Sequence, residues 1–156
     1  MSDIVQVITA EQLEQVSVLF GEYRAQLPIE YCFQSFDAEV AGLPGEYSLP
    51  KGALLLATVV GQPVGCVALR PFPIDGVCEM KRLYVRPGFR GDKLGRKLAE
   101  RIMQEARDRG YSRMRLDSYL ALMGSAVELY RKLGFREVDP KPLERVDGLI
   151  YMELRL

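Results

Sequence analysis

The chain of 156 residues contains no histidine and no tryptophan. Without histidine, a Ser-His-Asp triad, a Cys-His pair and histidine-ligated zinc are all excluded. Acid–base chemistry must therefore fall to carboxylates, tyrosines, lysines or water. No apolar run approaches the ~20 residues of a membrane span, and no signal-peptide pattern opens the chain. We expect a cytoplasmic protein with no membrane partner.

Cysteine is scarce, and the three cysteines, Cys32, Cys66 and Cys78, lack the spacing of metal ligands. Each lies in an apolar stretch, which is typical of reduced structural thiols and not of a disulfide framework. Cys66 and Cys78 have no histidine partner to activate them, so we expect protonated, inert thiols. The sequence predicts no metal site.

The charges balance to a net of zero but are unevenly distributed. Residues 1–50 contain eight acidic residues and one basic residue, whereas residues 80–97 contain seven basic residues and one acidic residue. A basic patch this local suits a compact polyanion better than a nucleic acid. Nucleic-acid binding usually needs a broader basic face. We expect no nucleic-acid partner. Solvated charges on helices and loops are the alternative interpretation.

The stretch from Cys78 to Lys97 reads as a strand, a tight turn and the basic, glycine-bearing start of a helix. A helix start offers backbone N–H groups without intrahelical partners and the positive end of the helix dipole. The pattern therefore predicts an anion site, and a pyrophosphate is the ligand that suits it best. No GxxxxGK[ST] loop is present, and only Gly91 and Gly95 fall where a dinucleotide fingerprint needs three glycines.

The spacing of apolar residues and turn signals predicts one mixed α/β domain spanning residues 1–156, without repeats or linkers. Thr9 to Gln12 forms a possible capping box, and Pro28 ends the helix that follows. The expected strands are Ile4–Ile8, Ala53–Val60, Val64–Leu69, Val77–Val85, Met114–Asp117, one beginning at Arg136, and Leu149–Leu154. The expected helices are residues 13–27, Ser35–Ala41, Gly91–Arg109 and Ser125–Leu133.

The loop Arg90-Gly-Asp-Lys-Leu-Gly95 resembles the (Q/R)xxGx(G/A) loop of the GNAT N-acetyltransferase superfamily at its first and last defined positions. Lys93 stands where the middle glycine is usual. Residues 126–135, AVELYRKLGF, resemble the second GNAT motif, AxxLYxxxGF. The predicted order β-α-α-β-β-β-α-β-α-β-β is also that of the GNAT fold, which is α/β with a splayed central sheet. The motif combination looks like a bacterial subgroup of unassigned substrate.

The resemblance implies that acetyl-CoA serves as co-substrate. Its pantetheine arm would fill the gap between the fourth and fifth strands and pair with the main chain of Leu83, Tyr84 and Val85. Its pyrophosphate would meet the turn at the start of the helix, where Gly91 and Gly95 permit close approach. A side chain at Lys93 departs from the family pattern at a place where backbone and phosphate come close. The residues implied for this turn are Arg90, Gly91, Asp92, Lys93, Leu94, Gly95 and Arg96.

Two catalytic residues follow from the same resemblance. Tyr130 matches the family tyrosine that gives a proton to the leaving thiolate, and Glu79 matches the base that several members use on the acceptor amine. The backbone N–H near Leu83 would stabilise the oxyanion. Tyr130 could instead pack on the sheet. A water relay could replace Glu79, which could simply form a salt bridge with the bases that follow it.

The implied reaction moves an acetyl group from acetyl-CoA to a primary amine of a small molecule or peptide by direct attack on the thioester. The alternative is a GNAT domain that binds acyl-CoA without turnover. The acidic excess in residues 1–50 would favour a cationic amine, and Tyr31, Gln34 and Tyr47 are candidate contacts. Because GNAT domains often dimerise, a homodimer is expected.

Overall fold

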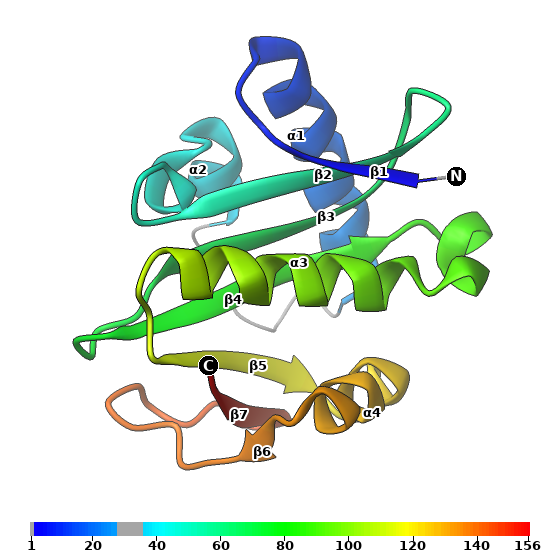
Figure 1. Cartoon of the computed structure of the whole chain (residues 1–156). Helices are drawn as coiled ribbons and strands as arrows, with labels where there is room; N and C mark the ends of the chain where they lie inside the picture. The colour runs from blue at the N-terminus through cyan, green and yellow to red at the C-terminus, as the bar shows by residue number, and fades with distance from the viewer. Residues whose placement is uncertain (1, 28–35) are drawn as a thin grey trace.

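The computed structural model describes residues 2–27 and 36–156 (Figure 1). Strands and helices follow in the order that the sequence predicts. The strands are β1 (Ser2–Gln6), β2 (Ala53–Val59), β3 (Gln62–Pro71), β4 (Val77–Val85), β5 (Arg113–Tyr119), β6 (Arg136–Glu137) and β7 (Leu149–Arg155). The helices are α1 (Ala10–Ala25), α2 (Phe36–Ala41), α3 (Leu94–Asp108) and α4 (Gly124–Leu133), with 3₁₀ turns η1 (Gly45–Tyr47) and η2 (Pro87–Asp92).

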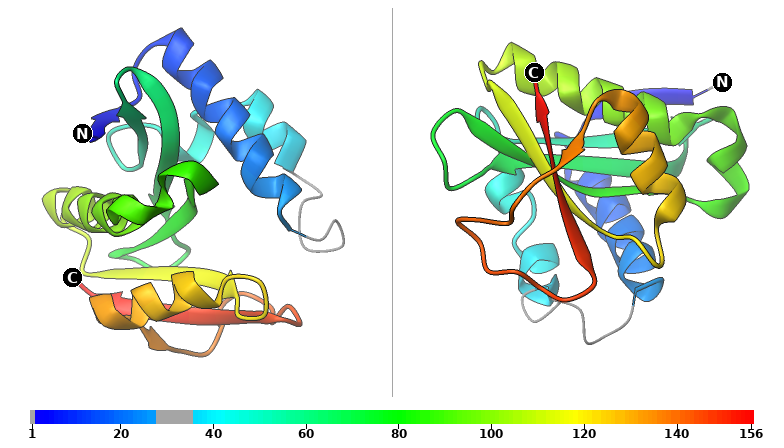
Figure 2. Two further views of the ribbon diagram at one scale, coloured as in Figure 1. Left: turned by 90° about the vertical axis from the view of Figure 1, so that its right-hand side faces the viewer. Right: turned by 90° about the horizontal axis from the view of Figure 1, so that it is seen from below.

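The seven strands form one sheet in the order β1-β2-β3-β4-β5-β7-β6. In the described chain, β4 and β5 are the parallel neighbours and the other neighbouring pairs are antiparallel. One apolar core joins α3 and α4 to one face of the sheet, and a second joins α1 and α2 to the other (Figure 2). The mixed α/β fold class predicted from the sequence is confirmed.

The sheet splays between β4 and β5. Their pairing covers three positions, from Val77 opposite Arg113 to Glu79 opposite Arg115. Beyond Glu79, β4 keeps pairing with β3 and β5 keeps pairing with β7, so the two strands diverge toward α4 (Figure 1). On the sides that face the gap, the backbone groups of β4 and β5 therefore have no partner strand, as the family resemblance implied.

A β-bulge in β4 lies beside the splay. The pairing shifts between Cys66 opposite Tyr84 and Ala68 opposite Lys81, so β4 contains one extra residue here. Arg82 takes a left-handed conformation, with φ of 59°, to accommodate it. The bulge turns the last residues of β4 relative to the first, which helps to separate this strand from β5.

Several element boundaries differ from the prediction by a few residues, and two of these differences have a local cause. The first strand ends at Gln6, because the N–H groups of Ile8 and Thr9 donate to the side chain of Gln12 in the capping box of α1. Helix α3 begins at Leu94 and not at Gly91, because η2 occupies the preceding residues. Pro28, which was predicted to end the first helix, lies outside the described residues. Ser35, the predicted start of the second helix, lies outside them too. Within residues 2–27 and 36–156, no helix has the length and apolarity to cross a membrane.

Candidate active site

A cavity of about 270 Å³, called here the slot, lies between the end of β4, the start of α3 and the start of α4. Five of the residues predicted to bind acetyl-CoA lie in its wall, and they come from the end of β4, from η2 and from the start of α3. Most of the lining residues are apolar, and a few polar side chains accompany them, as is typical of small-molecule sites. The lining residues are Gln26, Leu27, Leu83, Tyr84, Val85, Arg90, Gly95, Leu122, Met123, Ser125, Ala126 and Leu129.

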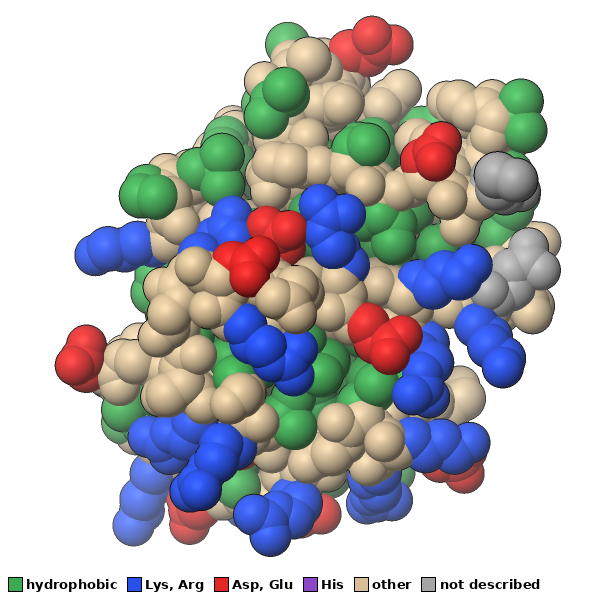
Figure 3. Space-filling view, in the orientation of Figure 1, with side chains coloured by type: hydrophobic (Ala, Val, Ile, Leu, Met, Phe, Trp, Pro, Cys, Tyr) green, Lys and Arg blue, Asp and Glu red, His purple; other side chains and the backbone are tan. Residues whose placement is uncertain are grey.

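The N-terminus of α3 adjoins the slot. The first hydrogen bond of the helix runs from the N–H of Lys97 to the carbonyl of Lys93, and none of the described side chains caps the helix start. The N–H groups of Leu94, Gly95 and Arg96 precede that bond, so they can serve a ligand. Lys and Arg side chains gather at this end of the molecule, where η2 leads into α3 (Figure 3). The arrangement can bind an anion.

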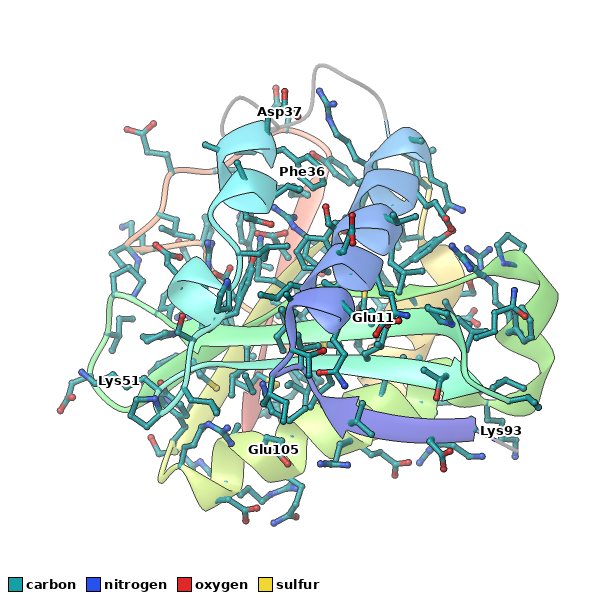
Figure 4. All side chains as sticks on the ribbon, turned by 90° about the horizontal axis from the view of Figure 1, so that it is seen from above. Glu11, Phe36, Asp37, Lys51, Lys93 and Glu105 are labelled. Atoms are coloured by element: carbon teal, nitrogen blue, oxygen red, sulfur yellow. The ribbon has the colours of Figure 1, made fainter. Side chains whose placement is uncertain are left out.

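Lys93 connects η2 to α3 in a left-handed conformation, with φ of 57° and ψ of 26°. This conformation is what glycine adopts without steric cost, and it explains why the family pattern places glycine here. The sequence interpretation considered only the side chain of Lys93 beside the phosphates and missed this backbone requirement. The Lys93 side chain is exposed and lies at the outer end of the turn (Figure 4). Lys93 therefore preserves the geometry of the turn.

Contacts within the chain do not require glycine at Gly91 or Gly95. A Cβ added to Gly91 would meet nothing within 4 Å, and one added to Gly95 would meet only the Val85 side chain, at 4.0 Å. Neither has a positive φ. The space beside both residues is thus open to a ligand, and it fits the pyrophosphate of acetyl-CoA.

Arg90 folds back along the wall of the slot. Its Nε donates to the carbonyl oxygen of Val85 at 2.7 Å, and its guanidinium lies 5.9 Å from the centre of the Tyr84 ring. The Tyr84 hydroxyl in turn donates to Glu22 on α1 at 3.1 Å. These contacts hold η2 against the end of β4 and place a positive charge beside the slot.

A smaller polar cavity, called here the recess, occupies the gap between β4 and β5. It measures about 20 Å³ and adjoins the slot at Leu83 and Met123, which line both cavities. It therefore has room for one group the size of a water molecule. The lining residues are Tyr23, Met80, Lys81, Arg82, Leu83, Leu116, Asp117, Ser118, Met123 and Tyr130.

Tyr130 reaches the recess from α4 and is 7% exposed. Its ring packs edge-on against Phe135, with 5.8 Å between centres. Tyr23 and Asp117 lie close enough to its hydroxyl to act on it electrostatically. Burial raises the pKa of Tyr130 well above its usual value, so the phenol is neutral at pH 7 and retains a proton to donate.

Glu79, the other predicted catalytic residue, is 4% exposed and lines neither the slot nor the recess. Its Oε1 accepts from Arg70 Nε at 2.9 Å, and its Oε2 lies 4.0 Å from Nζ of Lys81. Lys81 does line the recess, and its Nζ lies 3.7 Å from Oδ2 of Asp117. Lys81 therefore connects the Glu79 carboxylate to the recess.

Asp117 is a site residue that sequence reasoning missed. It lies in β5 beyond the last residue paired with β4 and contributes a carboxylate to the recess beside Tyr130. The sequence did contain a signal, because an acidic residue ends the predicted strand Met114–Asp117 directly after Leu116. Its significance depends on the divergence of β4, which brings the recess to this position.

Two of the acidic residues near the N-terminus form ion pairs with arginines. Glu22 of α1 pairs with Arg86 at 2.7 Å, and Glu39 of α2 pairs with Arg82 at 3.0 Å. The hydrogen bond from Arg86 holds the pKa of Glu22 below its ordinary value. Both arginines belong to the basic stretch 80–97, so part of the predicted basic patch holds the N-terminal helices and does not face the slot.

The remaining sequence candidates occupy the core or lie outside the described residues. Tyr47 is 2% exposed, packs on Phe20 and lines neither cavity, so it does not contact an acceptor there. Burial raises the pKa of the Cys66 thiol and raises that of Cys78 to about 12, which confirms that both are protonated at neutral pH. Tyr31, Gln34 and Cys32 lie outside the described residues.

A sheet that opens between two parallel strands, with a helix N-terminus at one end of the opening, defines the class of acyltransferases of the GNAT fold. The sequence model of the Acetyltransferase (GNAT) family matches residues 17–135. The chain therefore belongs to the GNAT family of acetyltransferases and is an acyltransferase. Members of this family transfer acetyl groups from acetyl-CoA to amine acceptors.

Similar proteins support this assignment. An uncharacterized N-acetyltransferase of Schizosaccharomyces pombe is 39% identical over 147 residues, covering 94% of this chain and 90% of the relative. The PaiA N-acetyltransferase of Thermoplasma acidophilum, solved in complex with coenzyme A, superposes with a TM-score of 0.78 at 20% identity, covering 100% of this chain and 99% of that one. YncA of Salmonella typhimurium, solved with acetyl-CoA, gives 0.74 at 21% identity, covering 99% and 93%. The first of these relatives is eukaryotic, so similarity across nearly the whole chain is not confined to bacteria.

Proposed function

We propose that this chain transfers an acetyl group from acetyl-CoA to a primary amine of a small molecule or a peptide by direct attack of the amine on the thioester. The observation that carries the proposal is the junction of the two cavities at Leu83 and Met123. The slot can hold an extended acyl-CoA arm, and the recess meets it beside the hydroxyl-bearing Tyr130. The amine and the thioester would meet at this junction.

Acetyl-CoA supplies the activated acyl group, and the chain supplies its binding surface. The main chain of Leu83, Tyr84 and Val85 lies where β4 has left β5, so these residues have backbone groups facing the slot side of the gap. The N–H groups at the start of α3 receive the pyrophosphate, together with the residues of the preceding turn. We propose this role for Arg90, Gly91, Asp92, Lys93, Leu94, Gly95 and Arg96.

Tyr130 donates the proton that the leaving thiolate needs. A coenzyme A thiol has a pKa of about 8.5, so protonation helps it to leave. We propose that Glu79, the base that the resemblance implies, acts by positioning Lys81, because its carboxylate lines neither cavity and its Oε2 lies 4.0 Å from Lys81 Nζ. The N–H groups of β4 near Leu83 are placed beside the junction and can stabilise the oxyanion.

Calorimetric titration with acetyl-CoA tests the binding half of the proposal. The wild type is expected to bind, and Gly95→Asp is expected to lower the affinity by about tenfold or more, because its carboxylate repels the phosphates. The same substitution places a negative charge in the first turn of α3, which favours the helix, so thermal stability is expected to hold. Equal affinities of the two proteins would contradict the proposed pyrophosphate site.

Thiol release in the presence of an amine panel tests the transfer half. Turnover with at least one primary amine is expected, and binding without thiol release would favour the alternative, an acyl-CoA sensor. No observation favours that alternative, since Lys93 keeps the turn geometry. One domain spanning residues 1–156, a cytoplasmic location and a homodimer complete the proposal and rest on the sequence. We propose no nucleic-acid partner, because part of the basic stretch pairs with Glu22 and Glu39.

A further inference from the structure

The recess contains one carboxylate that the motifs do not assign. Asp117 projects from β5 where β4 no longer pairs with it, and its side chain is 25% exposed. The charged and titratable groups that face it are Lys81 and Arg82 from β4, Tyr23 from α1 and Tyr130 from α4, and its cross-strand neighbour on β7 is Tyr151. Among the described residues, Asp117 is therefore the carboxylate that lines the recess, and none lines the slot.

The carboxylates around Asp117 already have close guanidinium partners. Glu79 accepts from Arg70 at 2.9 Å, Glu39 from Arg82 at 3.0 Å, and Glu153 from Arg115 at 2.7 Å. The cation nearest to Asp117 is Lys81, whose Nζ lies 3.7 Å away, which is too far for a hydrogen bond. Among these carboxylates, Asp117 has the greatest capacity to accept hydrogen bonds from an incoming ammonium group.

The size of the recess restricts what can enter it. A volume of about 20 Å³ admits a terminal amino group and excludes the rest of an acceptor. An amino group there lies among Asp117, Lys81 and Tyr130. The carboxylate attracts the ammonium form, and the positive charge of Lys81 favours its conversion to the neutral amine. The two charges together suit a group that must bind as a cation and react as a free base.

We propose that Asp117 binds the ammonium group of the acceptor and takes its first proton, an assignment that rests on the proposed function. The ammonium transfers a proton to the Asp117 carboxylate, and the nitrogen lone pair then attacks the thioester carbon. The C–N bond forms, the C–S bond breaks, and the thiolate sulfur takes the Tyr130 proton. The tyrosinate recovers a proton from the amide nitrogen, and Asp117 returns its own proton to solvent. Glu79 positions Lys81 and does not contact the acceptor.

The test compares Asp117→Asn with Glu79→Gln and with Asp108→Asn, a control at the far end of α3. Thiol release from acetyl-CoA is measured with ethylamine, spermidine and glycinamide at pH 7 and pH 9. Asp117→Asn is expected to lower kcat/KM by about 100-fold at pH 7, within the usual range for a lost general base. The loss is expected to shrink at pH 9, where more of the amine is already neutral. Asp117→Glu is expected to recover part of the activity.

Calorimetry with acetyl-CoA checks that each variant is folded and has an intact slot. Unchanged affinity together with the pH-dependent loss supports the assignment. A loss in Asp117→Asn no greater than that in Asp108→Asn would overturn it, as would an equal loss at both pH values. If the wild type binds acetyl-CoA but releases no thiol with any of the three amines, the transfer function fails and this assignment fails with it.

Discussion

At the scale of the residue, Lys93 affects the turn before α3 in two ways, through its backbone conformation and through its positive charge. The left-handed backbone costs a residue with a Cβ about 1 kcal/mol, whereas the ammonium adds positive charge beside the proposed phosphate site. Lys93→Gly removes both, and Lys93→Glu keeps the strain while reversing the charge. We expect Lys93→Gly to raise the free energy of unfolding by up to about 1 kcal/mol in urea denaturation.

Lys93→Gly and Lys93→Glu also distinguish the effect of the charge on acetyl-CoA binding from the effect of the backbone conformation. Acetyl-CoA affinity, measured by calorimetry, is expected to fall by about tenfold in Lys93→Glu and by less in Lys93→Gly. The difference is expected to narrow in high salt, because the interaction is exposed to solvent. Equal affinities of the glycine and glutamate variants at low salt would show that charge at this position does not contribute to binding.

Tyr130 provides a second prediction at this scale. Tyr130→Phe removes the proposed proton donor and keeps the ring that packs on Phe135. We expect kcat to fall by about 100-fold or more, with acetyl-CoA affinity and unfolding free energy nearly unchanged. Steady-state kinetics, calorimetry and urea denaturation measure the three quantities. Wild-type kcat in the variant would leave Tyr130 with a packing role only.

At the scale of the element, the bulge in β4 depends on a close approach to β3. A Cβ added to Gly65 would lie 2.8 Å from the carbonyl oxygen of Tyr84, closer than real Cβ atoms come to such an atom. Gly65→Ala is therefore expected to push the end of β4 away, at a cost of about 1–3 kcal/mol. Because Tyr84 lines the slot, acetyl-CoA affinity is expected to fall as well.

The matched control is Gly21→Ala in α1, where an added Cβ would meet nothing within 4 Å. Alanine is favoured over glycine in a helix by about 0.5–1 kcal/mol, so this variant is expected to gain stability. The two substitutions are chemically identical and are expected to change the unfolding free energy in opposite directions. A loss of stability in both, or in neither, would contradict the account of the bulge.

At the scale of the whole molecule, the sequence predicts the parts that depend on local pattern. Apolar spacing and caps gave the order of elements, and the two motifs led to the slot and to Tyr130 in the recess. The pairing of Glu22 with Arg86 was not predictable, because it joins helix α1 to the end of β4, far along the chain. Asp117 escaped notice for the same reason, since only the splay of the sheet exposes it.

The stability of the whole molecule is expected to fall in acid. Arginine partners hold the pKa values of Glu22, Glu105 and Glu153 below their ordinary value of 4.5. A lowered pKa in the folded state contributes stability above the unfolded value, and this is lost as pH falls below about 4.5. Glu153→Gln is expected to flatten the acid decline in urea denaturation. The exposed Glu137→Gln serves as its control and is expected to retain the decline.

The stability of the molecule at alkaline pH depends on buried groups that burial keeps neutral. Burial raises the pKa of Cys78 from 9.0 to about 12, and that of Tyr23 from 10.0 to about 12. The unfolded chain ionises these groups first, so their contribution is complete below pH 9 and is lost as pH rises toward 12. We expect the unfolding free energy to be level between about pH 5 and 9 and to decline above that range. Cys78→Ala is expected to decline less steeply than the wild type, and parallel declines would show that the buried thiol is not a source of the alkaline loss.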